Sequence, residues 1–124
     1  MSKYEEQIIH ILRAASIRFS REKTFSDLRG GRFRYDFYLP FYNILIEVDG
    51  EQHFKQVEKF QRSRAEFLKQ QENDRRKNSY ALANKIPLYR IPYWEIKNIK
   101  TFSDIIQQKF LVKNKWHNDY LAPK

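Results

Sequence analysis

One short stretch of the sequence gathers acidic residues and a histidine among apolar residues. Residues 43–54 read NILIEVDGEQHF, with Glu47 and Asp49 two positions apart and His53 four positions later. The chain holds 24 Lys and Arg and has a formal net charge of +9, yet none of these cations falls within residues 35–54. Carboxylate oxygens suit Mg²⁺, and an imidazole can exchange a proton near neutral pH. The stretch therefore predicts a metal site or a proton-transfer site.

Asp36 joins this cluster if two strands pair as the sequence indicates. Residues 33–39 (FRYDFYL) and residues 44–49 (ILIEVD) show the alternation of half-buried strands, which places the odd-numbered residues of the first strand on one apolar face. Between them, residues 40–43 (PFYN) have the composition of a hairpin turn. This turn sets a register in which Asp36 faces Glu47. Two facing carboxylates destabilise a sheet by a few tenths to about 1 kcal/mol.

A fold can keep such a cluster in three ways. One carboxyl can stay protonated, arginines can neutralise the acids, or a divalent cation can bind. A structural alternative places the acids on a solvent-exposed face, where Arg34 pairs with Asp49. We favour a cation, held by Asp36, Glu47 and Asp49 or by a backbone carbonyl beside them, such as that of Val48. The expected ion is Mg²⁺, and Mn²⁺ is expected to substitute for it.

The remaining elements place these strands in an α/β fold. Helical spacing of apolar residues predicts a helix over residues 3–16, and a capping box of Ser63 with Glu66 predicts a helix over residues 64–84. A third helix is expected after a capping box of Thr101 with Asp104, with an apolar stripe that runs to Phe110. Residues 17–25 and residues 86–91 read as further strands. The order of helices and strands predicts a small mixed sheet flanked by helices.

Composition restricts the class of protein. The chain has 124 residues, 41% of them hydrophobic, which suits one folded domain over residues 1–112. Residues 113–124 (KNKWHNDYLAPK) read as a basic and aromatic tail, either an arm or disordered. The absence of Cys excludes disulfides and thiolate metal sites. The absence of a signal-peptide layout and of a long apolar run leads us to expect a cytoplasmic protein without a membrane partner.

Three segments together resemble a known nuclease family. They read RYDFYLP at 34–40, IEVDGEQH at 46–53 and NDRRKNSYALANKIPLYRIPY at 73–93. They resemble the nuclease domain of the PD-(D/E)XK superfamily, in the branch similar to very-short-patch repair endonucleases, which includes phage homing endonucleases named for an EDxHD motif. The resemblance extends from about Ser2 to Trp94. It implies a restriction-endonuclease-like αβββαβ core.

The resemblance also implies roles for particular residues. The helical Glu of the family corresponds to Glu5, the strand Asp to Asp36, the His to His53 and the last Asp to Asp74. Glu5 also fits a helix-capping box with Ser2, which by itself would explain a Glu at that position.

Two of the motif positions raise further alternatives. Glu6 is the second choice for the helical acid. The superfamily's usual lysine position holds Asp49, so Lys77 is the substitute that we expect. Asp74 lies in the polar stretch KQQENDRRKNS, where a surface ion pair with Arg75 or Lys77 is the ordinary interpretation. A helical stretch with nothing apolar to bury is better explained if it borders a polar site.

The family implies a metal-dependent phosphodiesterase that cuts DNA, with His53 handling a proton and with Glu5 and Asp74 orienting water, metal or His53. Such an enzyme could be a homing-type nuclease of a phage or mobile element, or a nickase, in a bacterial or phage-infected cell, and a homodimer could cut both strands. Two alternatives are a nucleic-acid-binding module without catalysis and an RNA-directed nuclease. Phosphates would be bound by surrounding cations. These are Arg32, Arg34, Lys55, Arg75, Arg76 and Lys77, and in addition Arg29, Lys59, Arg62 and Arg64.

Overall fold

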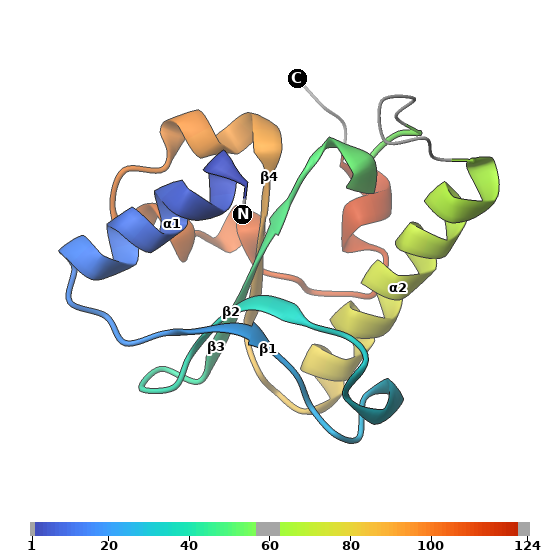
Figure 1. The fold of residues 1–124 in the computed structure, drawn as a ribbon, viewed down its shortest axis with the longest axis horizontal. Helices are drawn as coiled ribbons and strands as arrows, with labels where there is room; N and C mark the ends of the chain where they lie inside the picture. Colours follow the sequence, from blue (N-terminus) through green and yellow to red (C-terminus); the bar gives the residue numbers. More distant parts are fainter. Residues whose placement is uncertain (1, 57–62, 122–124) are drawn as a thin grey trace.

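The chain folds into a four-stranded sheet with helices on both faces (Figure 1). This computed structural model describes residues 2–56 and 63–121, so Lys59 and Arg62 lie outside the described residues. The helices and strands are α1 (Lys3–Ala14), β1 (Ser20–Lys23), β2 (Tyr35–Leu39), β3 (Ile44–Asp49), α2 (Arg64–Ala83), β4 (Leu88–Pro92) and α3 (Phe102–Ile105). Short 3-10 turns are η1 (Arg29–Gly31), η2 (Glu51–His53), η4 (Tyr93–Asn98), η5 (Gln108–Phe110) and η6 (His117–Tyr120).

The sheet is mixed and its strands follow the order β1-β2-β3-β4. β1 and β2 are antiparallel, as are β2 and β3, whereas β3 and β4 are parallel and are joined by α2. Leu39 pairs with Ile44 and Phe37 with Ile46, which is the predicted register. The expected α/β class, with a small mixed sheet between helices, is confirmed.

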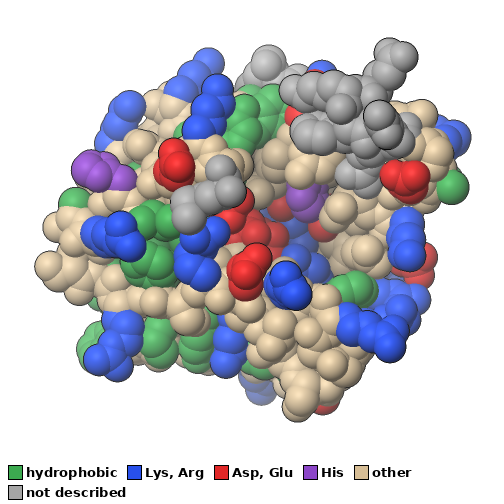
Figure 2. Space-filling model, viewed as in Figure 1, with side chains coloured by type: hydrophobic (Ala, Val, Ile, Leu, Met, Phe, Trp, Pro, Cys, Tyr) green, Lys and Arg blue, Asp and Glu red, His purple; other side chains and the backbone are tan. Residues whose placement is uncertain are grey.

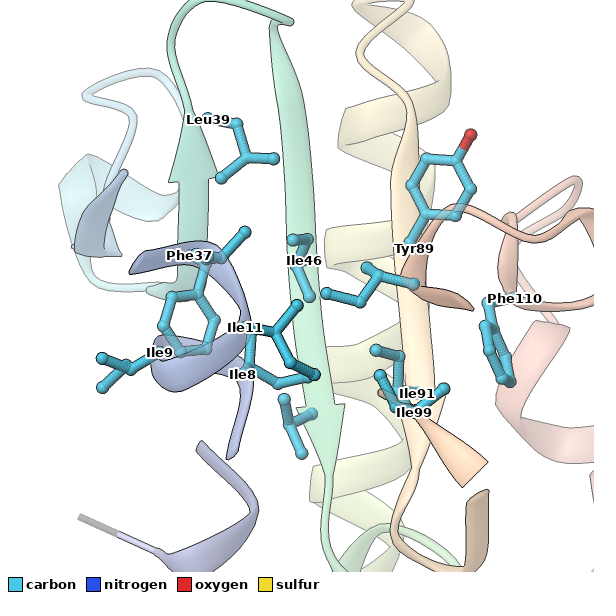
Figure 3. Packing of buried hydrophobic residues seen from close by; sticks show 13 residues of the cluster. Ile8, Ile9, Ile11, Phe37, Leu39, Ile46, Tyr89, Ile91, Ile99 and Phe110 are labelled. Atoms are coloured by element: carbon cyan, nitrogen blue, oxygen red, sulfur yellow. The ribbon is translucent and has the colours of Figure 1, made fainter. Parts of the chain in front are cut away.

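Two apolar clusters hold the layers together. On one face, Ile8 and Leu12 of α1 pack with Phe37, Ile46 and residues near α3, as Figure 3 shows for part of this cluster. On the other face, Ala81 of α2 belongs to a smaller cluster. α2 contributes few apolar side chains to this face. The residues that it buries are Asp74, Asn78 and Ala81. The polar stretch of this helix therefore faces a polar interior, as the sequence indicated.

The prediction that the odd-numbered residues of 33–39 share one apolar face is wrong. Tyr35 packs in the α2-side cluster, whereas Phe37 and Leu39 pack in the α1-side cluster. The alternation is interrupted at Asp36, whose carboxylate accepts a hydrogen bond of 2.7 Å from the Val48 amide. This hydrogen bond holds the Asp36 side chain beside β3.

The C-terminal part of the chain differs from expectation. Thr101 forms the predicted capping box with Asp104, but the helix ends at Ile105. Farther along the chain, Val112 donates a hydrogen bond of 2.9 Å to the carbonyl of Leu88 in β4. Residues 113–121 then lie against α2 through η6. None of the described helices is long and apolar enough to cross a membrane.

Candidate functional site

Asp36 lies on β2 where the strand changes face, next to Glu47 of β3. Burial, and secondly the negative charge of Glu47, raise the pKa of Asp36 to about 8, although the Val48 hydrogen bond and Lys77 oppose this shift. The sheet therefore brings two acids together, as the predicted register requires, and one of them is poorly compensated.

Glu47 is only 3% exposed and has Lys77 as its neighbour. The Lys77 ammonium lies 2.5 Å from Glu47 Oε1 and also donates to the carbonyl of Arg34 at 2.5 Å. Within the described residues, Glu47 Oε1 nevertheless accepts no hydrogen bond. The sequence led us to expect that Lys77 replaces the usual lysine of the superfamily, and the packing of α2 places Lys77 beside Glu47.

Glu5 of α1 lies near this pair of acids. It is the third residue of the helix and its backbone amide donates to the Ser2 hydroxyl, so the capping role is real. Its carboxylate accepts a hydrogen bond of 2.7 Å from Arg21, and its charge contributes to the raised pKa of Asp36. Glu6 is exposed. Of the two helical acids, Glu5 is therefore the one that borders Asp36.

Asp49 is fully buried and is already neutralised by protein groups. Arg90 of β4 donates to Asp49 Oδ1 at 2.7 Å and Asn118 donates to Oδ2 at 2.8 Å. Burial by itself would raise the pKa of Asp49, but the charges of Arg90 and His53 and these hydrogen bonds lower it overall. The structural alternative, a pair of Arg34 with Asp49, is wrong, since Arg34 lies at the surface, 3.9 Å from Glu22.

His53 forms a buried pair with Asp74. Its Nδ1 lies 2.9 Å from Asp74 Oδ2 and 3.6 Å from Asp49 Oδ1. Burial lowers the pKa of His53, but the charges of Asp49 and Asp74 outweigh burial and raise it to about 9. Gln70 donates to Asp74 Oδ1 at 3.2 Å. The alternative of a surface ion pair for Asp74 is wrong, because Asp74 is only 1% exposed and its carboxylate lies 2.9 Å from His53 Nδ1.

The sequence missed Arg90, Asn78 and Asn118, which complete this buried network. Arg90 is 0% exposed and donates to Asn78 Oδ1 at 2.7 Å, while its other guanidinium nitrogen lies 3.6 Å from Asp74. A signal for Arg90 existed, since it is the only charged residue in the apolar strand LYRIP. Asn118 lies in the segment that reads as a tail, where the sequence carries no such signal.

The residues present fit a divalent cation only in part. Within residues 2–56 and 63–121, no group of three or more His, Cys, Asp or Glu side chains is arranged to hold a metal ion. Asp36 and Glu47 fit better, because they lie together and Asp36 has a raised pKa, although the Lys77 ammonium lies 2.5 Å from Glu47 Oε1 and would have to share that oxygen with the ion. Mg²⁺ needs few protein carboxylates when phosphates and waters complete its shell. The carbonyl of Val48, next to Glu47 on β3, remains a further candidate ligand.

Asp49 does not fit as a metal ligand, which corrects the sequence-based ligand set. Both of its oxygens are bound by Arg90 and Asn118 at hydrogen-bond distance. A cation at Asp49 would have to displace a fully buried guanidinium, which would then lie buried without its counter-charge. Asp49 instead holds Arg90 beside His53 and Asp74.

Acidic side chains gather at the middle of one face, between α1 and α2, and Lys and Arg side chains surround them (Figure 2). Arg29, Arg32 and Arg64 are exposed. Most of the other predicted DNA-contacting cations form ion pairs: Arg34 with Glu22, Lys55 with Glu51 at 3.0 Å, Arg75 with Asp119 at 2.8 Å and Arg76 with Glu72 at 2.9 Å.

The chain matches no protein-family model, and no curated protein and no solved structure was found to be similar to it. The function is therefore argued from the site.

Proposed function

We propose that the chain is a metal-dependent phosphodiesterase that acts on DNA, with a restriction-endonuclease-like core. One observation supports this proposal most directly: Asp36 and Glu47 lie together, with Lys77 of α2 beside Glu47. Two acids and a lysine that converge from β2, β3 and α2 are the groups that hydrolysis of a phosphodiester needs. The element order α1-β1-β2-β3-α2-β4 agrees with the core that the sequence resemblance implies.

Each group has a role that follows from its contacts. A divalent cation held by Asp36 and Glu47 would activate a water and offset the charge that builds on the phosphate. Lys77 places a positive charge at Glu47, where it can contact a phosphate oxygen or the attacking water. Glu5 borders Asp36 and is fixed by Arg21 at 2.7 Å. Its role is to orient the water or the cation beside Asp36.

His53 is suited to donate a proton. Asp74 binds its Nδ1 at 2.9 Å, so Nε2 is the nitrogen that can exchange a proton with a substrate. The raised pKa of about 9 keeps the ring protonated at neutral pH. A protonated imidazole cannot ligate a metal or act as a base. Of the three roles that the sequence left open, the geometry therefore favours donation to the leaving oxygen, with Asp74 as the positioning residue.

A binding module without catalysis is the second candidate. It is favoured by the neutralisation of Asp49 by Arg90 and by the proximity of Lys77 to Glu47, because both pairs can serve stability alone. Such a module would bind DNA equally well with and without Mg²⁺, and Asp36→Ala would leave its binding unchanged. A panel of single-stranded, double-stranded and branched DNA together with RNA separates this candidate and the RNA-directed nuclease from the proposed enzyme.

The deciding experiment is a plasmid cleavage assay with Mg²⁺, Mn²⁺ or EDTA. Asp36→Asn is the test variant, because its amide oxygen can still accept the Val48 hydrogen bond while the ligand charge is removed. Asp27→Asn, an exposed carboxylate that accepts a hydrogen bond from Tyr80, is the matched control. Metal-dependent nicking or cutting by the wild type and the control, with a loss of at least about a hundredfold in Asp36→Asn, is the expected result. Equal activity of Asp36→Asn would disprove the proposal.

A further inference from the structure

A basic groove lies on the side of α2 that faces away from the acidic cluster. It is lined by η1, by α2 and by the segment that precedes η6, and it has a volume of about 700 Å³. Asp74, Lys77 and Asn78 of α2 face the sheet, whereas Arg75 and Arg76 face the groove. The groove is therefore separated from the candidate active site by the thickness of a helix.

The charges in this groove come from three separate segments of the chain. Arg29 belongs to η1, Arg75 and Arg76 to α2, and Lys115 to the C-terminal segment, while Glu72 is the single acid of the lining. Arg75 and Arg76 are bound by Asp119 and Glu72. Among the described residues, neither Arg29 nor Lys115 forms an ion pair. Arg29 lies over the ring of Phe33, and Lys115 lies over the ring of Trp116. The positive charge of the groove is thus incompletely balanced.

The ring of Trp116 contacts two of these cations. Its ring lies 4.7 Å from the guanidinium carbon of Arg75 and 4.6 Å from the Lys115 ammonium, and its side chain remains 38% exposed. Cation–π contacts of this kind hold a cation in place without neutralising it. An exposed indole can also stack on a base when a flexible lysine moves aside. The groove therefore presents pre-positioned charge beside an aromatic surface.

We propose that this groove binds the phosphate backbone of a nucleic-acid strand, independently of metal and of the acidic cluster. Cations on three segments suit a ligand with repeated negative charges better than they suit a single anion. Guanidinium groups match the geometry of phosphate oxygens, and the net charge of +9 attracts polyanions from solution. The ligand class is a nucleic-acid strand, with Trp116 available to one of its bases.

The test uses Trp116 as a local probe. The chain contains two Trp, so Trp94→Phe leaves Trp116 as the only indole. In EDTA, this variant is titrated with a fluorescently labelled oligonucleotide of about 20 nucleotides, single-stranded or duplex, and label anisotropy and Trp116 emission are both measured. We expect the emission of Trp116 to change with the same midpoint as the anisotropy. Binding that leaves Trp116 emission unchanged would overturn the inference.

The second test removes two cations of the groove and measures the affinity for the oligonucleotide and its salt dependence. In the same background, Arg29→Ala/Lys115→Ala should weaken binding at least about fivefold and reduce the slope of log Kd against log salt by about one to two. Arg18→Ala/Lys85→Ala removes two exposed cations that do not line the groove and is the matched control. Chemical denaturation of each variant checks that folding is intact. Equal affinity of both double variants would refute the groove.

Two further outcomes identify the ligand and separate the two proposals. If a poly-glutamate peptide of equal charge displaces DNA as well as unlabelled DNA does, the groove is an acidic-peptide site and the inference is wrong. Asp36→Asn should retain the Trp116 response, because the groove does not use the acidic cluster. If the protein gives the Trp116 response but does not cut DNA, the groove proposal stands and the nuclease proposal fails. If the protein cuts DNA without a Trp116 response, the nuclease proposal stands and the groove proposal fails.

Discussion

At the scale of single residues, the site divides the acids of the β3 region into two kinds. Asp49 is neutralised by Arg90, whereas Asp36 has a raised pKa because burial and Glu47 disfavour its charged form. The presence of an acidic strand in a basic chain thus has two explanations. Arg90 and Lys77 arrive from other elements to balance part of the charge, and the remaining acids are the candidate cation ligands.

Asp36 should make the metal-free protein less stable as pH rises. The pKa of about 8 in the folded protein lies above the unfolded value of 3.8, so the contribution is fully present below about pH 4 and is lost progressively up to about pH 8. In EDTA, the free energy of unfolding of the wild type should fall relative to that of Asp36→Asn by an amount on the order of a few kcal/mol over this range. Chemical denaturation at several pH values measures it. Parallel pH profiles would contradict the prediction, and Asp27→Asn should keep the wild-type profile.

Arg90→Leu should be strongly destabilising. It leaves the buried carboxylates of Asp49 and Asp74 without their shared cation, and breaking a buried ion pair in this way costs about 3–5 kcal/mol. Arg34→Leu is the control, because its ion pair with Glu22 is exposed and its loss should change stability by less than about 0.5 kcal/mol. Urea denaturation compares the two variants. A loss below about 1 kcal/mol in Arg90→Leu would show that the network adds little to stability.

At the scale of elements, the C-terminal segment completes the buried network instead of projecting from the domain. Asn118 is the second residue of η6 and donates to Asp49, and Asp119 accepts from Arg75 of α2. Asn78 of α2 donates to the carbonyl of Lys115 at 3.1 Å. The segment therefore ties α2 to β3 at the level of the candidate site.

Removal of this segment should destabilise the whole domain. A chain that ends at Val112 loses the hydrogen bond to the charged Asp49 and the Arg75 ion pair, and we expect a loss of roughly 2–4 kcal/mol in the free energy of unfolding. A chain that ends at Leu121 keeps all of these contacts and is the control. Thermal and urea denaturation of both chains test this. Equal stability would show that the segment is dispensable.

At the scale of the whole molecule, a net charge of +9 and a central acidic cluster oppose each other in DNA binding. The surrounding cations attract phosphates, whereas uncompensated carboxylates repel them at the point where the scissile phosphate would lie. A divalent cation would remove that repulsion.

Ca²⁺ should therefore tighten DNA binding by roughly three- to tenfold relative to EDTA at equal ionic strength. Above about pH 8, where Asp36 is charged, Asp36→Asn should bind in EDTA at least as tightly as the wild type and gain less from Ca²⁺, because one repelling charge is already gone. Anisotropy titrations of a labelled duplex measure both effects. The same Ca²⁺ response in wild type and Asp36→Asn would show that the ion does not bind at Asp36.

The sequence by itself determined the α/β class, the hairpin register and the meeting of Asp36 with Glu47, because period-two alternation and turn length are local properties of the chain. Only the tertiary structure decided which cations balance the acids. Arg90 and Asn118 reach the cluster from β4 and the C-terminal segment, and no local pattern encodes such distant contacts. Lys77 was expected near the acids, but only the packing of α2 shows that it pairs with Glu47. For the same reason the sequence assigned Asp49 to a metal and left a surface ion pair open as the alternative for Asp74, whereas both carboxylates are buried in a network around His53.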